Sequence, residues 1–356
     1  MTSIITISAL RAALMPLRFN PEKARDASAA NVDEAALVSV LRTQGLAPLW
    51  SELAETRQVL ISDALRLELI GSRGLATARY LLQRRSAVRV SAYLSTAGIR
   101  HAVFKGAAVR EHLYADPALR PAVDIDVLVA PQSRVPAIRA LIREQYGFMG
   151  ARNTISHEAV LTDRHTTIDL HWALFRPGRS RCELAPILLE TVRPLGPLSA
   201  LSDDANLLVM LVHPALTKHV NGRGGRLIRA VDLDQMLGRI QPDWDWILSL
   251  IDAAGLRTAA WAVLIWQRAL MDTPVDPVVL RYLEPGRFQR RYLGYWIDHQ
   301  LPARLGGVPG LVQGAFSLAL HERAADGLRA IAQLLKGRLA SGRTLRHLQR
   351  LSQTLD

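Results

Sequence analysis

Cysteine and long apolar runs are nearly absent from this sequence. The only cysteine, Cys182, excludes an internal disulfide and a zinc site built from several cysteines. No apolar run reaches the roughly 20 residues that a membrane-spanning helix needs; the stretch 205–211 is too short and is followed by His213 and Pro214. The N-terminus lacks a basic segment followed by a long apolar core, so we expect no signal peptide. These absences favour a reduced, cytoplasmic setting.

Lysine is also scarce, although the chain is strongly basic. Lys and Arg together number 44 and give a net charge of +12, yet only four of these residues are lysines: Lys23, Lys105, Lys218 and Lys336. A lysine ammonium binds phosphate as a compact point charge that arginine does not freely replace. Lys105 and Lys218 are therefore candidate phosphate contacts, because both fall in segments described below. The remaining composition, 49% apolar and 21% charged over 356 residues, is typical of a globular protein with two or three packed units.

Common nucleotide-binding motifs are missing as well. The sequence has no Gly-x₄-Gly-Lys-Ser/Thr loop, no Gly-x-Gly-x-x-Gly after an expected strand, and no protein-kinase signature. The segment 221–225, Asn-Gly-Arg-Gly-Gly, is basic and glycine-rich, but nothing around it resembles a phosphate-binding loop. The main competing nucleotide-binding folds are thereby excluded.

What the sequence does contain is a pair of acids inside an apolar strand. Asp124 and Asp126 lie in the run 123–129, Val-Asp-Ile-Asp-Val-Leu-Val. Residues i and i+2 of a strand share a face, so both carboxylates should emerge together among apolar side chains. Carboxylates so close do not both ionise without a cation, and oxygen-only ligation favours Mg²⁺ or Mn²⁺. The alternative is that the two acids flank a turn, where Asp is common; the apolar continuation favours a metal site.

A hairpin is expected further along the chain. After a helix-like stretch over 133–146 come two short strand candidates, 157–161 and 166–172. The polar link between them, 162–165, is typical of a hairpin turn.

The second of these strands carries a third acid. Asp169 and His171 share one of its faces. Three carboxylates on neighbouring strands can hold two metals roughly 3.5–4 Å apart for a displacement at phosphorus. The alternative for Asp169 is the ordinary alternation of any half-buried strand. His171 either orients an acceptor or serves as a base, or it is a structural residue; we expect the structural role for His171 and for His157.

Two basic positions near the acids allow more than one interpretation. Gly106 either only permits a tight strand-to-helix turn, or the Lys105-Gly106 turn presents backbone N–H groups and a helix N-terminus to a triphosphate, with Lys105 adding charge. Arg120, four residues before Asp124, either neutralises phosphate or pairs with Asp116.

The order of these motifs resembles the nucleotidyltransferases of the polymerase-β superfamily. Over about 99–176, an apolar strand is followed by Lys-Gly, a helix, Arg-Pro-x-x-Asp-Ile-Asp-x-Leu-Val, a helix, a hairpin and Ile-Asp-Leu-His-Trp. The match is closest to the bacterial "uncharacterised nucleotidyltransferase" group, whose members usually have Lys-Gly where most of the superfamily has Gly-Gly or Gly-Ser. A weaker match extends over 204–237, where the group often has residues similar to these: His213, Lys218, His219 and Asp232.

The resemblance implies a fold and an activity. The fold is α+β, with a small mixed sheet and helices. The activity is Mg²⁺-dependent transfer of a nucleoside monophosphate from an NTP, with release of pyrophosphate. The residues in question are the predicted catalytic metal ligands Asp124, Asp126 and Asp169 and the predicted nucleotide contacts Lys105, Gly106, Arg120, Lys218 and His219.

Residues of the weaker match also have plainer explanations. Lys218 or His219 either reaches the nucleotide from a second domain or lies at a solvated helix end. His213 and His219 are six residues apart, so they do not share a helical face as zinc ligands at i and i+4 would. Asp232 is three residues from Arg229 and is a candidate ion-pair partner for it.

The sequence predicts three regions. Residues 1–97 carry helical periodicity, 98–176 alternate short strands with helices and form the predicted catalytic core, and 177–356 are predicted to be helical again.

The acceptor of the nucleotide stays open between three classes. An RNA would suit the stretch 281–296, which interleaves arginine with aromatics, unless a helix there buries its aromatics and exposes its arginines. A small hydroxylated metabolite is a second class. A peptide or protein is a third, implied only by the resemblance. A different possibility is an inactive module that binds a nucleotide, an RNA or another partner without turnover.

Overall fold

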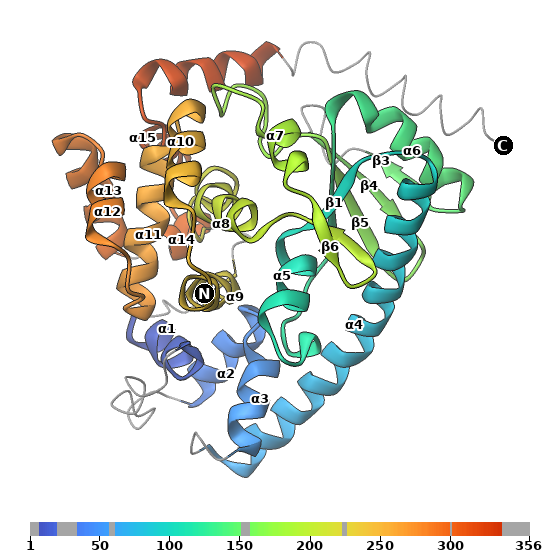
Figure 1. The fold of residues 1–356 in the computed structure, drawn as a ribbon. Coiled ribbons are helices and arrows are strands. Elements are labelled where there is room, and N and C mark those ends of the chain that lie inside the picture. The colour runs from blue at the N-terminus through green and yellow to red at the C-terminus, as the bar shows by residue number, and fades with distance from the viewer. Residues whose placement is uncertain are drawn as a thin grey trace.

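A seven-stranded mixed sheet forms the centre of one half of the protein (Figure 1). The computed structural model describes residues 7–19, 34–56, 61–150, 157–222, 226–299 and 301–336. The strands lie in the order β3-β4-β5-β2-β1-β7-β6, and helices pack on both faces. The expected α+β class, a small mixed sheet flanked by helices, is confirmed.

The centre of the sheet consists of β1 (His101–Phe104), β2 (Ile125–Val129) and β5 (Thr167–His171). β2 is antiparallel to β1 and parallel to β5. Its register places Asp126 next to Asp169 across the β2–β5 pair. The middle of the sheet therefore brings together acids that are far apart in the sequence.

The hairpin expected over 157–172 is present. β4 (Glu158–Thr162) pairs antiparallel with β5, and β3 (Gly147–Gly150) extends the sheet beyond β4. Asp163 closes the turn, because its carboxylate accepts hydrogen bonds from two backbone N–H groups later in the turn. Arg164 adopts the left-handed conformation there, with φ of +77°. Turn chemistry and strand alternation thus agree, which is why the sequence predicts this element well.

The region after residue 176, predicted to be helical with breaks at several prolines and glycines, also contains two strands. β6 (Arg193–Leu195) and β7 (Leu198–Ala200) form a second hairpin, and β7 pairs parallel with β1. Gly196 in its two-residue loop adopts a φ of +57°, which glycine tolerates without strain. Strands of three residues are too short to show an alternating pattern in the sequence. The prolines at 194 and 197 therefore indicated only a break between helices.

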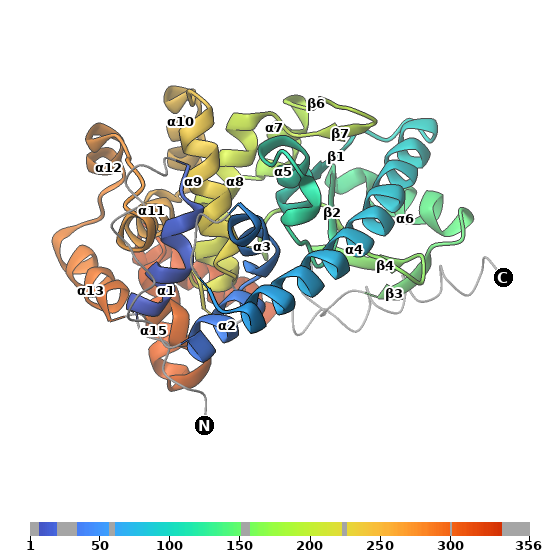
Figure 2. The ribbon, with the colours of Figure 1, turned by 90° about the horizontal axis from the view of Figure 1, so that it is seen from below.

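The outer face of the sheet is covered by α4 (Asp63–Thr96) and α6 (Arg134–Arg143). Their buried residues pack against Ile125, Val127 and other apolar side chains of β1, β2, β4 and β5. Because strand residues alternate, Asp126 points to the opposite, inner face. α4 has 34 residues, a length of about 51 Å at 1.5 Å per residue. Figure 2 shows it running along the molecule, so it contacts the sheet with one end and the helical half with the other.

On the inner face, the sheet meets α5 (Lys105–Leu113), α8 (Asp203–Lys218) and α9 (Ile228–Arg239). Phe104 and Leu128 join buried residues of these helices in the larger hydrophobic core. The face that carries the acids therefore looks toward helices.

The N-terminal helices pack against late parts of the chain. They are α1 (Ile7–Leu14), α2 (Glu34–Thr43) and α3 (Ala47–Glu55). Trp50 is fully buried and donates its Nε1–H to the carbonyl oxygen of Ala13 at 2.8 Å. Arg11 pairs with Asp272 at 2.6 Å, just after α11 (Arg257–Met271). The first and the later helices thus form one packed half.

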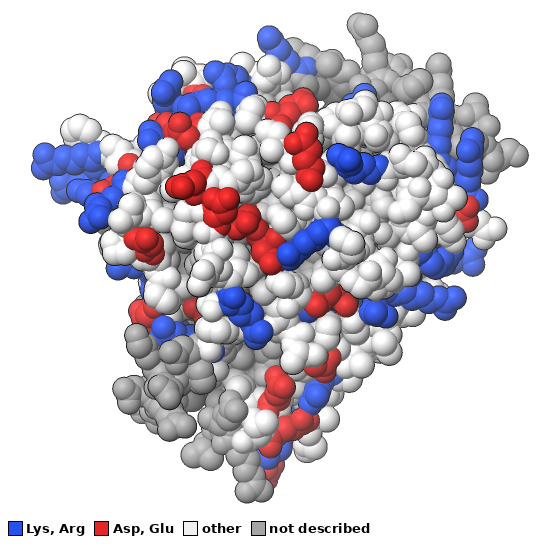
Figure 3. Space-filling model, viewed as in Figure 1, with Lys and Arg blue, Asp and Glu red and all other residues white. Residues whose placement is uncertain are grey.

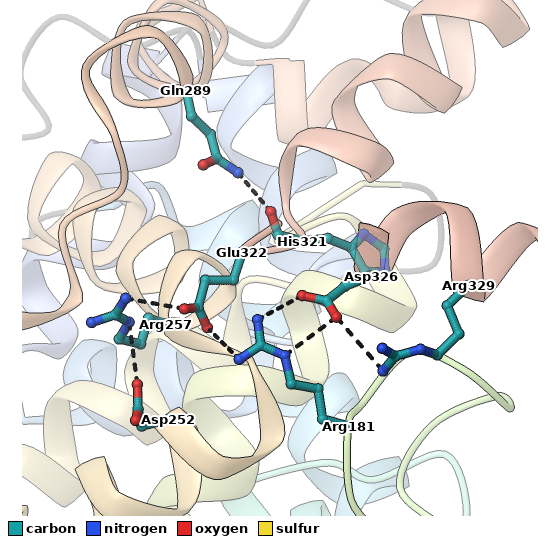
Figure 4. A network of polar contacts seen from close by, with 8 residues as sticks. All are labelled: Arg181, Asp252, Arg257, Gln289, His321, Glu322, Asp326 and Arg329. Atoms are coloured by element: carbon teal, nitrogen blue, oxygen red, sulfur yellow. Dashed lines mark hydrogen bonds and ion pairs between the residues drawn. The ribbon is translucent and has the colours of Figure 1, made fainter. Parts of the chain in front are cut away.

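The remaining helices complete that half. They are α10 (Trp244–Ala254), α12 (Pro277–Leu283), α13 (Arg287–Asp298), α14 (Leu301–Arg304), α15 (Gly310–Ala319) and a helical stretch over 324–336. Arg181, shortly before α7 (Leu184–Glu190), anchors them through ion pairs with Asp326 at 2.7 Å and Glu322 at 3.6 Å. Arg257 also donates to Glu322, at 3.0 Å (Figure 4). Among the described residues, no helix has the length and apolar character to span a membrane.

Candidate active site

Two carboxylates and one imidazole converge on the inner face of the sheet. Asp126 and Asp169 are adjacent because β2 and β5 run parallel and in register. His171 lies two residues after Asp169, on the same face of β5. One ligand atom from each of the three side chains lies within 4.8 Å of the other two, and all three residues are buried. The strand pattern predicts two of these side chains as metal ligands, whereas for His171 it favours a structural role over a role as a base or in orienting the acceptor.

The ammonium of Lys105 belongs to the same cluster. Its Nζ is 2.8 Å from Oδ1 of Asp126 and 3.3 Å from Nε2 of His171. Nε2 of His171 is itself 2.8 Å from the same carboxylate oxygen. Burial alone would raise the pKa of the Asp126 carboxyl, but the charge of Lys105 and the contact with His171 outweigh it and hold the pKa well below its usual range. Asp126 is therefore a carboxylate at neutral pH.

Gly106 lies just after the sharp turn between β1 and α5. Lys105 adopts a φ of +52°, in the left-handed region, and α5 begins directly after the strand. A Cβ on residue 106 would lie 2.2 Å from Nη1 of Arg120. Glycine at this position therefore leaves room for the guanidinium of Arg120, a role that the sequence did not indicate.

Arg120 is held by a partner far along the chain. Its Nη2 and Nε donate to the two carboxylate oxygens of Asp232 on α9, at 2.5 and 3.1 Å. Tyr114 donates its hydroxyl to the same carboxylate at 2.8 Å. The proposed pairing of Arg120 with Asp116 is thus replaced by a buried pair that joins the sheet region to α9, and the carboxylate of Asp232 is held by Arg120 rather than by Arg229. Arg120 still lines the cavity described below.

Glu158 is a site residue that the sequence analysis missed. It lies opposite His171 in the β4–β5 pair, and its Oε2 is 3.3 Å from Nδ1 of His171. His157 lies beside this pair, with its ring centroid 5.8 Å from that of His171. Burial and the charge of His171 lower the pKa of His157 to about 2. Counting back from the predicted hairpin turn would have placed Glu158 opposite His171.

Asp124 stands slightly apart from the cluster. It precedes β2 and lines the same cavity. It is not one of the three described residues whose ligand atoms approach within 4.8 Å. The structure thus places Asp124 at the edge of the site and Asp126 and Asp169 at its centre.

A cavity of about 550 Å³ lies over these residues, between the sheet and the helices. Its acidic wall comes from β2 and β5. The lining of the cavity also includes cationic side chains from the segment before α7, from the end of α8, from the segment before α9 and from α9 itself, namely Arg176, Arg179, Lys218, Arg226 and Arg229. Nη1 of Arg229 is buried and has no hydrogen-bond partner among the described residues. A volume of this size suits a nucleotide, and the cationic wall suits its phosphates.

The other basic residues predicted at the site line this cavity too. Lys218 is the last residue of α8, and His219 follows in the left-handed conformation with φ of +49°. Nδ1 of His219 lies 2.8 Å from the hydroxyl of Ser317. His213 lines the cavity and is half-buried, and its desolvation lowers the pKa of the imidazole well below the usual value.

The donor set at the centre fits a divalent cation. Two carboxylates and an imidazole are ligands that Mn²⁺ and related ions accept, and carboxylates alone suit Mg²⁺. The two acids are buried next to each other, so a cation would also relieve their repulsion.

Comparison with known proteins adds one match. A family model described as "Uncharacterised nucleotidyltransferase" matches residues 30–272, more than half of the chain. This range contains the whole sheet and the cavity walls from α8 and α9. No curated protein matches the sequence.

Proposed function

The chain belongs to the uncharacterised nucleotidyltransferase family, and from this premise we propose that it transfers a nucleoside monophosphate from an NTP to a hydroxyl or similar acceptor, releasing pyrophosphate. The observation that carries the proposal is the in-register pairing of β2 and β5, which sets Asp126 beside Asp169 in the wall of the cavity. We propose Mg²⁺ or Mn²⁺ as the cofactor.

In this proposal the acids bind the metal cofactor, and one of them accepts a proton from the acceptor hydroxyl. Asp126 and Asp169 are the central ligands, and Asp124 completes the set from the edge of the site. A divalent cation bound there supplies charge neutralisation for the phosphates and lowers the pKa of an acceptor hydroxyl. Asp169, at the centre of the cluster, accepts the proton that the hydroxyl loses.

The basic residues orient the triphosphate. Lys218 and His219 at the end of α8, together with Arg229 on α9, line the same cavity as the acids. The unsatisfied Nη1 of Arg229 supports a phosphate contact, since a buried donor without a partner costs free energy until a ligand binds it. Arg120 acts differently: its pair with Asp232 fixes the position of α9, and thereby that of Arg229.

The acceptor is the finer part of the proposal, and one observation favours RNA. On α13, Phe288 is 89% exposed and lies between the exposed residues Arg287 and Arg290, and Tyr295, four residues after the exposed Arg291, is 52% exposed. Lys and Arg gather at the left edge of Figure 3, where α13 lies. Exposed aromatics interleaved with arginine are typical of surfaces that stack single-stranded bases. An RNA acceptor predicts binding that weakens steeply with salt and weakens roughly tenfold in Phe288→Ala.

Transfer and mere binding are separated by one assay. The protein is incubated with each α-³²P-labelled NTP, Mg²⁺ or Mn²⁺, and candidate RNA, peptide and sugar acceptors. Label transfer together with pyrophosphate release supports an enzyme. NTP binding without either would identify a binding module instead.

The decisive variant is Asp126→Asn. It removes one central carboxylate, so we expect it to abolish label transfer while the circular dichroism spectrum stays that of the wild type. Asp63→Asn serves as the control, because the Asp63 side chain is fully exposed on α4. Turnover of Asp126→Asn at the wild-type rate, at matched purity, would refute the assignment.

A further inference from the structure

The acidic cluster is contacted by a cationic side chain of the protein itself, the ammonium of Lys105. It contacts two of the three clustered side chains, Asp126 and His171, at 2.8 and 3.3 Å. Those two side chains approach each other to 2.8 Å. At that distance a proton on Nε2 of His171, which depends on its tautomer, or a cation beside the two atoms holds them together. Lys105 adds a positive charge to this pair from the protein itself.

The other nitrogen of His171 is directed toward Glu158. Nδ1 lies 3.3 Å from Oε2 of Glu158, on the neighbouring strand. This contact is an ion-pair distance without hydrogen-bond geometry. A histidine with a carboxylate beside one nitrogen and a cation beside the other nevertheless resembles a metal-ligating histidine. The strand register therefore presents His171 to a cation together with Asp126 and Asp169.

Lys105 combines a flexible side chain with a constrained backbone. Its φ of +52° lies in a region that residues other than glycine rarely adopt. Its Nζ also lies 4.7 Å from the centre of the Phe104 ring. The Lys105 side chain is 18% exposed and that of Asp126 is 12% exposed, and both line the cavity. The ammonium can therefore leave the cluster for the cavity without unfolding of the sheet.

We propose, on the basis of the function proposed above, that Asp126, Asp169 and His171 form a mixed oxygen–nitrogen cation site, which the ammonium of Lys105 occupies in the metal-free protein and from which a divalent metal displaces it. Lys105 then enters the cavity, where the triphosphate is the available anion. Lys105 is thus the counter-ion of Asp126 when no metal is bound, and it contacts the triphosphate when the metal is bound.

A nitrogen ligand also sets the metal preference. Imidazole binds first-row transition metals better than it binds Mg²⁺, and Mn²⁺ accepts both carboxylate and imidazole. We therefore expect the protein to bind Mn²⁺ more tightly than Mg²⁺. Replacement of the His171 imidazole by an amide oxygen should reduce the difference between the Mn²⁺ and Mg²⁺ affinities.

The test is the affinity for Mn²⁺ alone, measured by the electron paramagnetic resonance signal of the free ion, with Mg²⁺ as a competitor. Lys105→Met removes the competing ammonium and should tighten Mn²⁺ binding about tenfold, the equivalent of one charge-assisted contact. Lys218→Met is the matched control, because it removes the same charge from the same cavity but not from the cluster. It should change the affinity by less than about twofold.

Two further variants test the imidazole. His171→Asn should weaken Mn²⁺ binding about 100-fold and Mg²⁺ binding less, and Glu158→Gln should weaken Mn²⁺ binding about tenfold. Thermal melting of each variant without metal separates a lost ligand from a lost fold.

Several outcomes would overturn the inference. Lys105→Met with unchanged or weaker Mn²⁺ affinity would show that the lysine does not compete. An equal gain in Lys218→Met would indicate a general charge effect. A loss in His157→Asn as large as that in His171→Asn would move the metal to the neighbouring His157–Glu158–His171 group. If these results came with normal label transfer, only this inference would fail; absence of both Mn²⁺ binding and transfer would remove the proposed function as well.

Discussion

The buried pair of Arg120 and Asp232 should be among the most consequential polar contacts for stability. The two residues are 6% and 3% exposed, and two hydrogen bonds join them across 112 residues of sequence. Replacement of Asp232 by leucine leaves a buried guanidinium without its counter-charge and the Tyr114 hydroxyl without its acceptor. Loss of one partner of a buried ion pair typically costs about 3–5 kcal/mol, and we expect Asp232→Leu to lower the free energy of unfolding by that amount.

The double variant Arg120→Met/Asp232→Leu separates charge from packing. Buried ion pairs are often replaceable by apolar residues of similar volume at little cost, so the double variant should regain most of the loss. The control is the exposed pair of Arg42 and Glu68, whose side chains are 68% and 40% exposed. Glu68→Gln should change the stability by less than about 0.5 kcal/mol.

Urea unfolding, followed by tryptophan fluorescence and by far-ultraviolet circular dichroism, measures all four proteins. Coincident transitions from the two probes are needed before free energies are compared. If Asp232→Leu stayed within about 1 kcal/mol of the wild type, the pair would contribute little to stability. A double variant no more stable than the single one would mean that the loss is a packing defect, and the reasoning from charge would be refuted.

Two further predictions follow from the same structure. Gly106→Ala places a Cβ 2.2 Å from a guanidinium that Asp232 holds in place, so it should lower the free energy of unfolding by about 1–3 kcal/mol. Arg120→Met itself lowers stability because it leaves Asp232 unpaired, but in that background the additional cost of Gly106→Ala in urea unfolding should be much smaller than in the wild type. The pKa of His157 falls from 6.5 to about 2 on burial, so the folded protein binds fewer protons than the unfolded one below pH 6.5. The free energy of unfolding is therefore unaffected by this histidine above pH 6.5, and it decreases by about 1.4 kcal/mol per pH unit as the pH falls below that value. Urea unfolding at pH 7, 6 and 5 should therefore show a shallower decline for His157→Asn, and an identical decline in variant and wild type would contradict the shift.

The parts of the fold that the sequence predicted well are set by local rules. Alternation along β2 and β5 and the turn chemistry at Asp163 put Asp126 and Asp169 on one face, and the structure has that arrangement. Glu158 was within reach of the same rules, because the hairpin turn fixes which residue lies opposite His171. Its place at the site follows from the pairing of β4 with β5 rather than from alternation along one strand.

Other features depend on contacts that no local pattern encodes. Arg120 meets Asp232 only after α9 has packed onto the sheet region, and Trp50 meets Ala13 only after α1 and α3 have packed together. The β6–β7 hairpin joins the sheet through a single registered pair with β1, at Val103. Such contacts follow from tertiary packing, which overrides the short-range preferences of the residues involved.

Anomalous diffraction from crystals that contain Mn²⁺ and a non-hydrolysable NTP tests the central claim most directly. We expect one anomalous peak within coordination distance of the carboxylates of Asp126 and Asp169, with the triphosphate between that peak and the cationic wall of Lys218 and Arg229. Absence of a peak at the two carboxylates, while the triphosphate occupies the cavity, would contradict the account.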